Sequence, residues 1–201
     1  MKILVLSGSR NRKGQTARAV NAICRGVLGA GENIEVLFLT ECNVERCRQC
    51  DEDGWGTCRS ESFCVIDDDF AGIVDKVEES DAIVFANPVY FGDLCESMKA
   101  FLDRFRRIRF FNMIAGGRFN RERSSADSKT PVLGICYAGG SGNGTTSCCA
   151  NLEHILKECG FDVVDMIPVR RQNIEAKLPI LELTGKWLAR KPTSGPSFVP
   201  K

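Results

Sequence analysis

The sequence has almost no net charge and no long hydrophobic run. Lysine and arginine number 27 against 26 for aspartate and glutamate, which leaves a formal net charge of +1 over 201 residues. This balance favours neither nucleic acid nor a membrane surface as a partner. No apolar run approaches the length of a membrane-spanning helix, and the N-terminal segment has no signal-peptide pattern. We therefore expect a cytoplasmic protein that binds neither nucleic acid nor membrane.

Histidine is also nearly absent. The single histidine, His154, falls within a helical pattern and is expected at the surface. The sequence offers no convincing catalytic acid or base, which directs attention to chemistry supplied by a bound cofactor.

Cysteine, by contrast, is abundant, with 11 residues. An odd number without a signal peptide argues against a secreted disulfide scaffold. Cys24, Cys136 and Cys159 lie in apolar patterns and are expected in the core. Of the vicinal pair Cys148 and Cys149, we expect one packed and one exposed side chain. A further group gathers in one polar, glycine-bearing segment, residues 42–64: Cys42, Cys47, Cys50, Cys58 and Cys64.

Apolar runs typical of buried strands alternate with helical patterns along the chain. The expected strands cover residues 3–6, 34–39, 82–86, 131–137 and 161–167, and each precedes a segment with helical spacing, the last over 178–188. Five such repeats predict an α/β fold with a parallel sheet and helices on both faces. We expect one domain over 1–190 and a disordered tail over 191–201. Residues 106–129, rich in arginine, are expected to form an insertion whose arginines make a solvated face or bind a phosphorylated pyridine nucleotide.

Three glycine-bearing loops directly follow expected strands, over residues 8–16, 87–92 and 138–145. In a parallel sheet these loops share the carboxyl edge, where ligands bind. The first loop precedes a helix N-terminus, whose N–H groups and dipole favour an anion. Ser9, Gln15 and Thr16 add side-chain donors, and the loop length suits a single terminal phosphate. The first loop taken alone favours an anion site, with an ordinary turn and cap as the alternative.

The three loops together resemble those of the NAD(P)H-dependent FMN reductase family, including its iron–sulfur flavoprotein branch. The family's Gly-Ser-x-Arg-x-x-x-Asn-Thr loop is matched from Gly8 to Thr16, with Asn11 in place of the arginine and Gln15 in place of the asparagine. Its Pro-x-Tyr-x-Gly and Lys-x-Phe-x-Asp-Arg motifs are matched by residues 88–92 and 99–104. The resemblance implies a flavodoxin-like, doubly wound sheet of order 2-1-3-4-5 with bound FMN. The implied FMN contacts are Ser9, Asn11, Gln15 and Thr16 at the phosphate, with Arg10 or Arg12 as its charge partner, Pro88, Val89, Tyr90, Phe91 and Gly92 beside the ring, and Gly139 and Gly140 at its pyrimidine side.

Four closely spaced cysteines form a candidate metal site: Cys47, Cys50, Cys58 and Cys64. Four thiolates suit a [4Fe–4S] cluster or tetrahedral zinc. The iron–sulfur flavoprotein branch carries a C-x2-C-x2-C-x5-C motif, whereas here Asp53 occupies the third cysteine position and Cys58 is the substitute. Three interpretations stay open, namely an iron–sulfur cluster, zinc, or free redox thiols. Cys42 is a spare ligand, although we expect it to pack at a strand end.

The resemblance implies an FMN-dependent oxidoreductase that takes hydride from NADH or NADPH. The electrons would pass to a quinone, another small acceptor or a protein partner. The cysteine-bound cluster is one route that they could take. A homo-oligomer, dimer or tetramer, is also implied. Two alternatives are a non-enzymatic electron carrier like the flavodoxins and a flavin-free zinc-binding module.

Overall fold

The computed structural model describes residues 1–115 and 129–190, without the side chains of residues 110–115. Its centre is one sheet of parallel strands, which are β1 (Lys2–Ser7), β2 (Asn33–Phe38), β3 (Ala82–Pro88), β4 (Pro131–Ala138) and β5 (Asp162–Arg170). Their spatial order is β2-β1-β3-β4-β5, and chain order reverses between β1 and β3. The predicted α/β class and strand order 2-1-3-4-5 are therefore confirmed.

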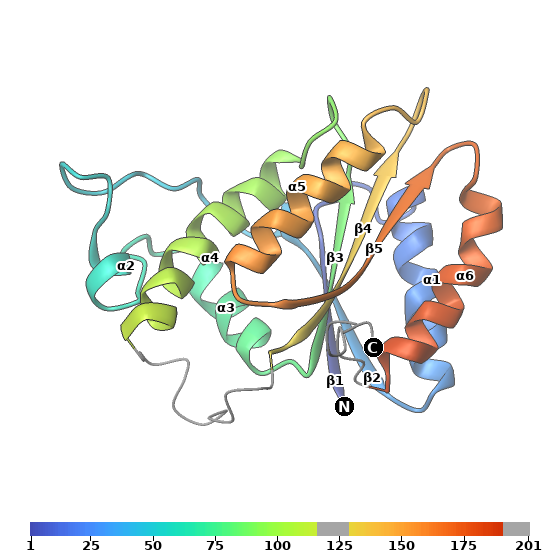
Figure 1. Ribbon diagram of the computed structural model, residues 1–201, viewed down its shortest axis with the longest axis horizontal. Helices are drawn as coiled ribbons and strands as arrows, with labels where there is room; N and C mark the ends of the chain where they lie inside the picture. The colour runs from blue at the N-terminus through green and yellow to red at the C-terminus, as the bar shows by residue number, and fades with distance from the viewer. Residues whose placement is uncertain (116–128, 191–201) are drawn as a thin grey trace, which may run out of the picture.

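Helices cover both faces of the sheet (Figure 1). One face carries α1 (Gln15–Gly29) and α6 (Ile174–Leu188), which pack against each other. The other carries α3 (Phe70–Glu78), α4 (Glu96–Ala115) and α5 (Thr145–Glu158). A short 3₁₀ turn, η1 (Leu39–Glu41), follows β2, and the four-residue helix α2 (Thr57–Ser60) lies against α4 within the cysteine-rich segment.

The continuous apolar runs of the central strands follow from burial on both faces. Side chains alternate between the faces of a strand, so Ile3 and Val5 join the core under α1 and α6, whereas Leu4 and Leu6 join the opposite core. That second core contains a series of contacting phenylalanines, with ring centroids 5.4–5.8 Å apart. The sheet is thus rigidly held from both sides, and its carboxyl edge is free to carry loops.

Several local predictions need correction. Helix α4 continues to Ala115, past the expected start of the insertion at Arg106, because the side chain of Ile108 is buried in the core and extends the apolar face. Helix α6 begins at Ile174 rather than near residue 178 and includes Pro179. Residues 116–128 and the expected tail 191–201 lie outside the described residues.

The isolated cysteines are mostly where the sequence placed them. Cys136 and Cys159 are fully buried, Cys24 is partly buried against the core, and His154 is exposed, as predicted. Cys42 packs against the core at the end of β2, also as predicted. The expectation for the vicinal pair is wrong, because Cys148 and Cys149 are both buried. Both pack into the core on the α5 side of the sheet, where the Cys148 sulfur accepts a hydrogen bond from Asn87 of β3.

Candidate functional site

The loop after β1 ends at the N-terminus of α1 in an arrangement suited to an anion. Gly14 is the N-cap residue and no side chain caps the helix, so the N–H groups of its first turn are available to a ligand. Thr16 and Ser9 are buried, with exposed fractions of 4% and 6%. The Ser9 hydroxyl also shapes the loop, since it donates to the Asn11 carbonyl at 3.2 Å and accepts from the Asn11 N–H at 3.3 Å.

Both arginines and the glutamine of this loop have protein partners. Arg10 pairs with Glu96 of α4, and Arg12 pairs with Glu41 of η1. The amide oxygen of Gln15 accepts a hydrogen bond from Arg18 at 2.9 Å. Either arginine would have to leave its carboxylate to meet a phosphate. The backbone and the hydroxyls of the loop are therefore the groups best placed to receive one.

The loop after β3 turns sharply and presents aromatic side chains to solvent. Tyr90 and Asp93 pair through two backbone hydrogen bonds of 3.2 and 3.0 Å. Between them Phe91 and Gly92 both have positive φ, 51° and 81°, as a tight type I′-like turn requires. Phe91 is fully exposed and Tyr90 is 55% exposed. Two rings at a loop edge are available to pack on a flat ligand.

Asn87, the residue before this loop, is fully buried and fixes its start. The side-chain amide donates to the Pro88 carbonyl at 2.9 Å and to the Cys148 sulfur at 3.3 Å. Its carbonyl oxygen accepts from the N–H of Cys95 at 3.0 Å. The sequence analysis placed this residue at the start of the loop without giving it a role. A polar side chain at the carboxyl end of a buried strand was the available signal.

The third loop lies against the second. The Ser147 hydroxyl donates to the Gly92 carbonyl at 2.9 Å, and a Cβ at Gly144 would stand 2.4 Å from the Cα of Gly92. By contrast, a Cβ at Gly139 or Gly140 would meet nothing within 4 Å. The open backbone at these two glycines provides space into which a ligand could fit, as the sequence suggested. The FMN-contact residues named from the sequence thus share one edge of the sheet.

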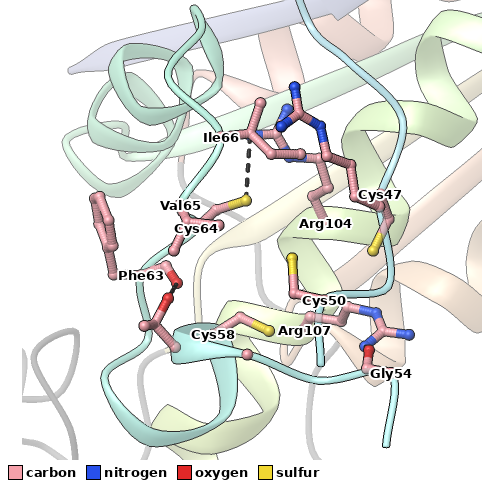
Figure 2. Close-up of a pocket in the computed structure, with 13 residues that line it drawn as sticks. Cys47, Cys50, Gly54, Cys58, Phe63, Cys64, Val65, Ile66, Arg104 and Arg107 are labelled. Atoms are coloured by element: carbon pink, nitrogen blue, oxygen red, sulfur yellow. Dashed lines mark hydrogen bonds between the residues drawn. The ribbon is translucent and has the colours of Figure 1, made fainter. Parts of the chain in front are cut away.

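The four cysteines proposed as metal ligands line one pocket (Figure 2). Cys47 and Cys50 come from the irregular segment after η1, Cys58 from α2, and Cys64 from the irregular segment before α3. Asp53, which occupies the family's third cysteine position, instead pairs with Arg59 at the surface, at 3.1 Å. The structure therefore brings Cys58 and not Asp53 to the pocket.

Metal binding itself stays a prediction. Within residues 1–115 and 129–190, no three histidine, cysteine or carboxylate side chains are arranged to hold a metal ion. The chemistry of the lining nevertheless suits an anionic tetrathiolate centre, because the same pocket is lined by Arg104 and Arg107 of α4.

Arg104 is almost completely buried, and its guanidinium is held by Asp68 through bonds of 2.6 and 3.0 Å. One nitrogen also donates to the Cys64 sulfur at 3.3 Å (Figure 2). Burial alone would raise the pKa of Asp68, but hydrogen bonds from Arg104 and from two backbone N–H groups hold it below its ordinary value. Sequence reasoning quoted this arginine in a motif without giving it a role.

Arg107 and Arg109 are also engaged, which corrects the expectation of a solvated arginine face. Arg107 donates to the Gly54 carbonyl at 2.6 Å and lies 4.6 Å from the centre of the Trp55 ring. Arg109 donates to the Cys159 carbonyl at 3.2 Å and pairs with Glu78 at 3.0 Å. Among the arginines of the expected insertion, those at 118, 121 and 123 lie outside the described residues.

Left-handed backbone conformations occur in the cysteine-rich segment and in the loop after β3. In the described part of the chain, the non-glycine residues with positive φ are Gln49, Asp51, Ser62 and Phe91. Three lie in the cysteine-rich segment, and the fourth lies in the loop after β3. Such conformations are unfavourable for L-residues and gather at binding sites. The backbone therefore points to the two sites that the side chains define.

The fold and the loop-bearing edge define a flavodoxin-like α/β protein. Solved structures with this fold include a flavone reductase (TM-score 0.68, 18% identity, 94% of this chain and 62% of that one). Another is the NAD(P)H:quinone oxidoreductase from Methanothermobacter marburgensis (TM-score 0.68, 20% identity, 94% and 96% coverage). At these identities the likeness establishes the fold.

Within this class, the chain belongs to the NADPH-dependent FMN reductase family, whose profile matches residues 1–174. It is similar to the iron-sulfur flavoprotein of Methanosarcina thermophila, with 33% identity over 145 residues, 72% of this chain and 66% of that protein. An iron-sulfur flavoprotein of Archaeoglobus fulgidus is 31% identical over 112 residues, 56% of this chain and 52% of that protein. The chain thus spans between about half and two thirds of these relatives. Among the described residues, no helix is long and apolar enough to cross a membrane.

Proposed function

We propose that this protein is an FMN-dependent oxidoreductase that accepts hydride from NADH or NADPH and delivers electrons to a quinone, another small acceptor or a protein partner. The observation that carries the proposal is the convergence of three glycine-bearing loops on an uncapped helix N-terminus at the sheet edge. That edge offers backbone donors for a phosphate and exposed rings for a flat ligand. Membership of the FMN reductase family supports the same cofactor.

In this proposal each loop has a separate task. The N-terminus of α1, with Ser9, Asn11, Gln15 and Thr16, would bind the FMN phosphate. Residues 88–92 would border the isoalloxazine ring, and the open backbone of Gly139 and Gly140 would meet its pyrimidine side. Bound flavin would supply the hydride and electron chemistry, so the protein's part is to bind, orient and exclude water.

We further propose that Cys47, Cys50, Cys58 and Cys64 hold a [4Fe–4S] cluster, which supplies one-electron transfer when bound. Their shared pocket and its cationic lining support an anionic tetrathiolate centre over free thiols. The names of the similar iron-sulfur flavoproteins point the same way. The left-handed residues at 49, 51 and 62 show that the cysteine-rich segment is tightly turned around this pocket.

The test begins with the visible spectrum of anaerobically purified protein, with flavin, iron and zinc quantified. Flavin bands with added broad absorbance and about four irons per chain would support both cofactors. Stoichiometric zinc in place of iron would indicate a zinc site and refute the cluster. Bound flavin without NAD(P)H oxidation would indicate an electron carrier. A protein that takes up no FMN on addition would refute the main proposal.

A pair of matched variants then tests the phosphate site. Thr16→Ala should weaken FMN binding about tenfold, since one charge-assisted hydrogen bond contributes roughly 1.5 kcal/mol. Thr184→Ala is the control, because Thr184 is half-buried on α6 and its hydroxyl donates to the Ile180 carbonyl of the same helix at 2.9 Å. Fluorescence titration of apoprotein with FMN would measure both, and equal affinities would contradict the assignment.

A further inference from the structure

Two arginines on successive turns of α4 face the cysteine pocket in different ways. Arg104 donates one N–H to the Cys64 sulfur at 3.3 Å. Its Nε is buried and, among the described residues, has no hydrogen-bond partner. Buried donors of a charged group are rarely left unpaired, because the missing bond is costly. The residue with this orphaned N–H is one of those that line the cysteine pocket.

Arg107 brings an unbalanced positive charge to the same pocket. Among the described residues, Arg107 contacts the Gly54 carbonyl and the face of Trp55, neither of which carries a formal charge. The charge of Arg104, in contrast, is already matched by the carboxylate of Asp68. The pocket lining thus combines an N–H of Arg104, which donates to the Cys64 sulfur, with the positive charge of Arg107.

The two arginines would act differently on four free thiols and on a cluster held by four thiolates. Four neutral thiols would gain little from a nearby cation. A [4Fe–4S] cluster with four thiolate ligands is an anion that becomes more negative by one charge when it is reduced. Net charge near the cluster and hydrogen bonds to its sulfurs are the groups through which a protein sets its reduction potential.

We propose that Arg104 and Arg107 are positioning residues that raise the reduction potential of the cluster, an inference that rests on the proposed function of the cysteine pocket. Arg104 would act through its hydrogen bond to the Cys64 sulfur, and Arg107 through its charge. The step they favour is the gain of one electron by the cluster from a reductant such as reduced flavin. No covalent bond forms or breaks in that step, and no proton moves.

The position of α4 links this effect to the flavin edge. At the start of the helix, the Cys95 thiol and the Ser97 hydroxyl donate to the Gly8 carbonyl in the first loop, at 3.4 and 3.5 Å. Arg104 lies about 10 Å further along the axis, at a rise of 1.5 Å per residue. Asp68 fixes the guanidinium through two hydrogen bonds, and Arg104 lines the pocket. One rigid helix therefore contacts both cofactor sites.

The experiment is a potentiometric titration of the intact protein with dithionite, followed by electron paramagnetic resonance of the reduced cluster. We compare Arg107→Gln and Arg104→Lys with the wild type. In each variant the ratio of reduced to oxidised cluster at a fixed potential should fall about tenfold, a shift of 59 mV for one electron. Arg59→Gln is the matched control, because Arg59 is a nearby exposed arginine that does not line the pocket. Its midpoint should equal that of the wild type.

The outcomes separate this inference from the proposed function. Wild-type protein without bound iron refutes the cluster and, with it, the role of the arginines. Full iron content with unchanged midpoints in Arg107→Gln and Arg104→Lys leaves the cluster in place and overturns the inference alone. An equal shift in Arg59→Gln also overturns it, since any lost charge would then suffice. If Arg104→Lys does not fold, Arg107→Gln decides the charge effect by itself.

Discussion

At the scale of single residues, Phe91 combines an unfavourable conformation with complete exposure. A left-handed backbone disfavours an ordinary L-residue by about 1–2 kcal/mol, and the fully exposed ring gains little from packing in return. A residue that weakens the fold without a packing gain is a sign of selection for a ligand. We interpret Phe91 as a ring held ready for the flavin or its substrate.

Replacing Phe91 by asparagine, which tolerates the left-handed region, should therefore have opposite effects on stability and binding. We expect the free energy of unfolding to stay equal or to rise by up to about 1 kcal/mol, while FMN affinity falls. Denaturant unfolding of the apoprotein and FMN titration would measure the two effects. Phe91→Tyr, which keeps a ring, is the control and should retain the affinity. A destabilised Phe91→Asn protein with unchanged affinity would contradict this interpretation.

The buried thiol of Cys159 makes the stability of the protein depend on pH. Burial raises the pKa of its thiol to about 12, whereas the unfolded chain has a thiol pKa of about 8.5. Above about pH 8.5 the unfolded state loses a proton that the folded state keeps, so stability must fall as the pH rises towards 12. Cys159→Ala should be less stable at pH 7, because it leaves a cavity, yet its stability should decline less between pH 9 and 11. Urea unfolding at several pH values would test this, and parallel declines would refute it.

At the scale of elements, α1 and α6 pack so closely that glycine is required at the contact. A Cβ at Gly26 would stand 2.0 Å from the Glu182 carbonyl oxygen, and one at Gly185 would stand 2.3 Å from the Ile23 carbonyl oxygen. Both obstacles are backbone atoms, which cannot turn aside as a side chain can. The contact therefore depends on these two small residues.

Gly26→Ala should destabilise the protein by about 3 kcal/mol or more, because the helices must separate. Gly29→Ala in the same helix is the matched control, since its Cβ would meet only the Lys186 side chain at 3.6 Å. Higher helix propensity should leave that variant neutral or slightly more stable. Thermal unfolding would compare them, and similar midpoints would show that α1 and α6 are free to adjust.

The elements also show how far sequence reasoning reaches. The strands were predictable because their apolar runs require burial on both faces, as Leu4 and Val5 illustrate. The end of α4 was not, because its arginines obscure the helical period that Ile108 continues. The burial of both Cys148 and Cys149 depends on the close approach of α5 to β3 through Asn87. Contacts of this kind join residues that are distant in the chain, and local spacing carries no record of them.

The candidate flavin site was predictable in part, because the topology of the sheet fixes where its loops lie. Loops that follow strands must gather at one edge, so the positions of Ser9, Val89 and Gly139 followed from topology. The pairing of Arg10 and Arg12 with Glu96 and Glu41 did not, because each partner comes from another element. The sequence did name Cys58 in place of Asp53, and the structure adds that the short helix α2 carries Cys58 to the pocket.

At the scale of the whole molecule, two candidate cofactor sites share one rigid framework and use different residues. The flavin edge is built from loops at the carboxyl ends of β1, β3 and β4, and the cysteine pocket from the segment between η1 and α3 together with α4. Helix α4 is the element common to both. Binding at one site should therefore be independent of the other, whereas transfer of electrons should require both.

Cys58→Ala and Thr16→Ala test this division. We expect Cys58→Ala to lose most of its iron but to bind FMN with wild-type affinity, because Cys58 touches none of the three loops. Thr16→Ala, prepared with little FMN, should keep its iron. In neither variant should NADPH reduce a cluster. Stopped-flow absorbance would measure this reaction in the wild type and in both variants. Asp53→Ala is the control for the cysteine-rich segment and should keep both cofactors, since Asp53 lies at the surface beside Arg59. Rapid cluster reduction by NADPH in a flavin-free protein would contradict the proposed order of electron flow.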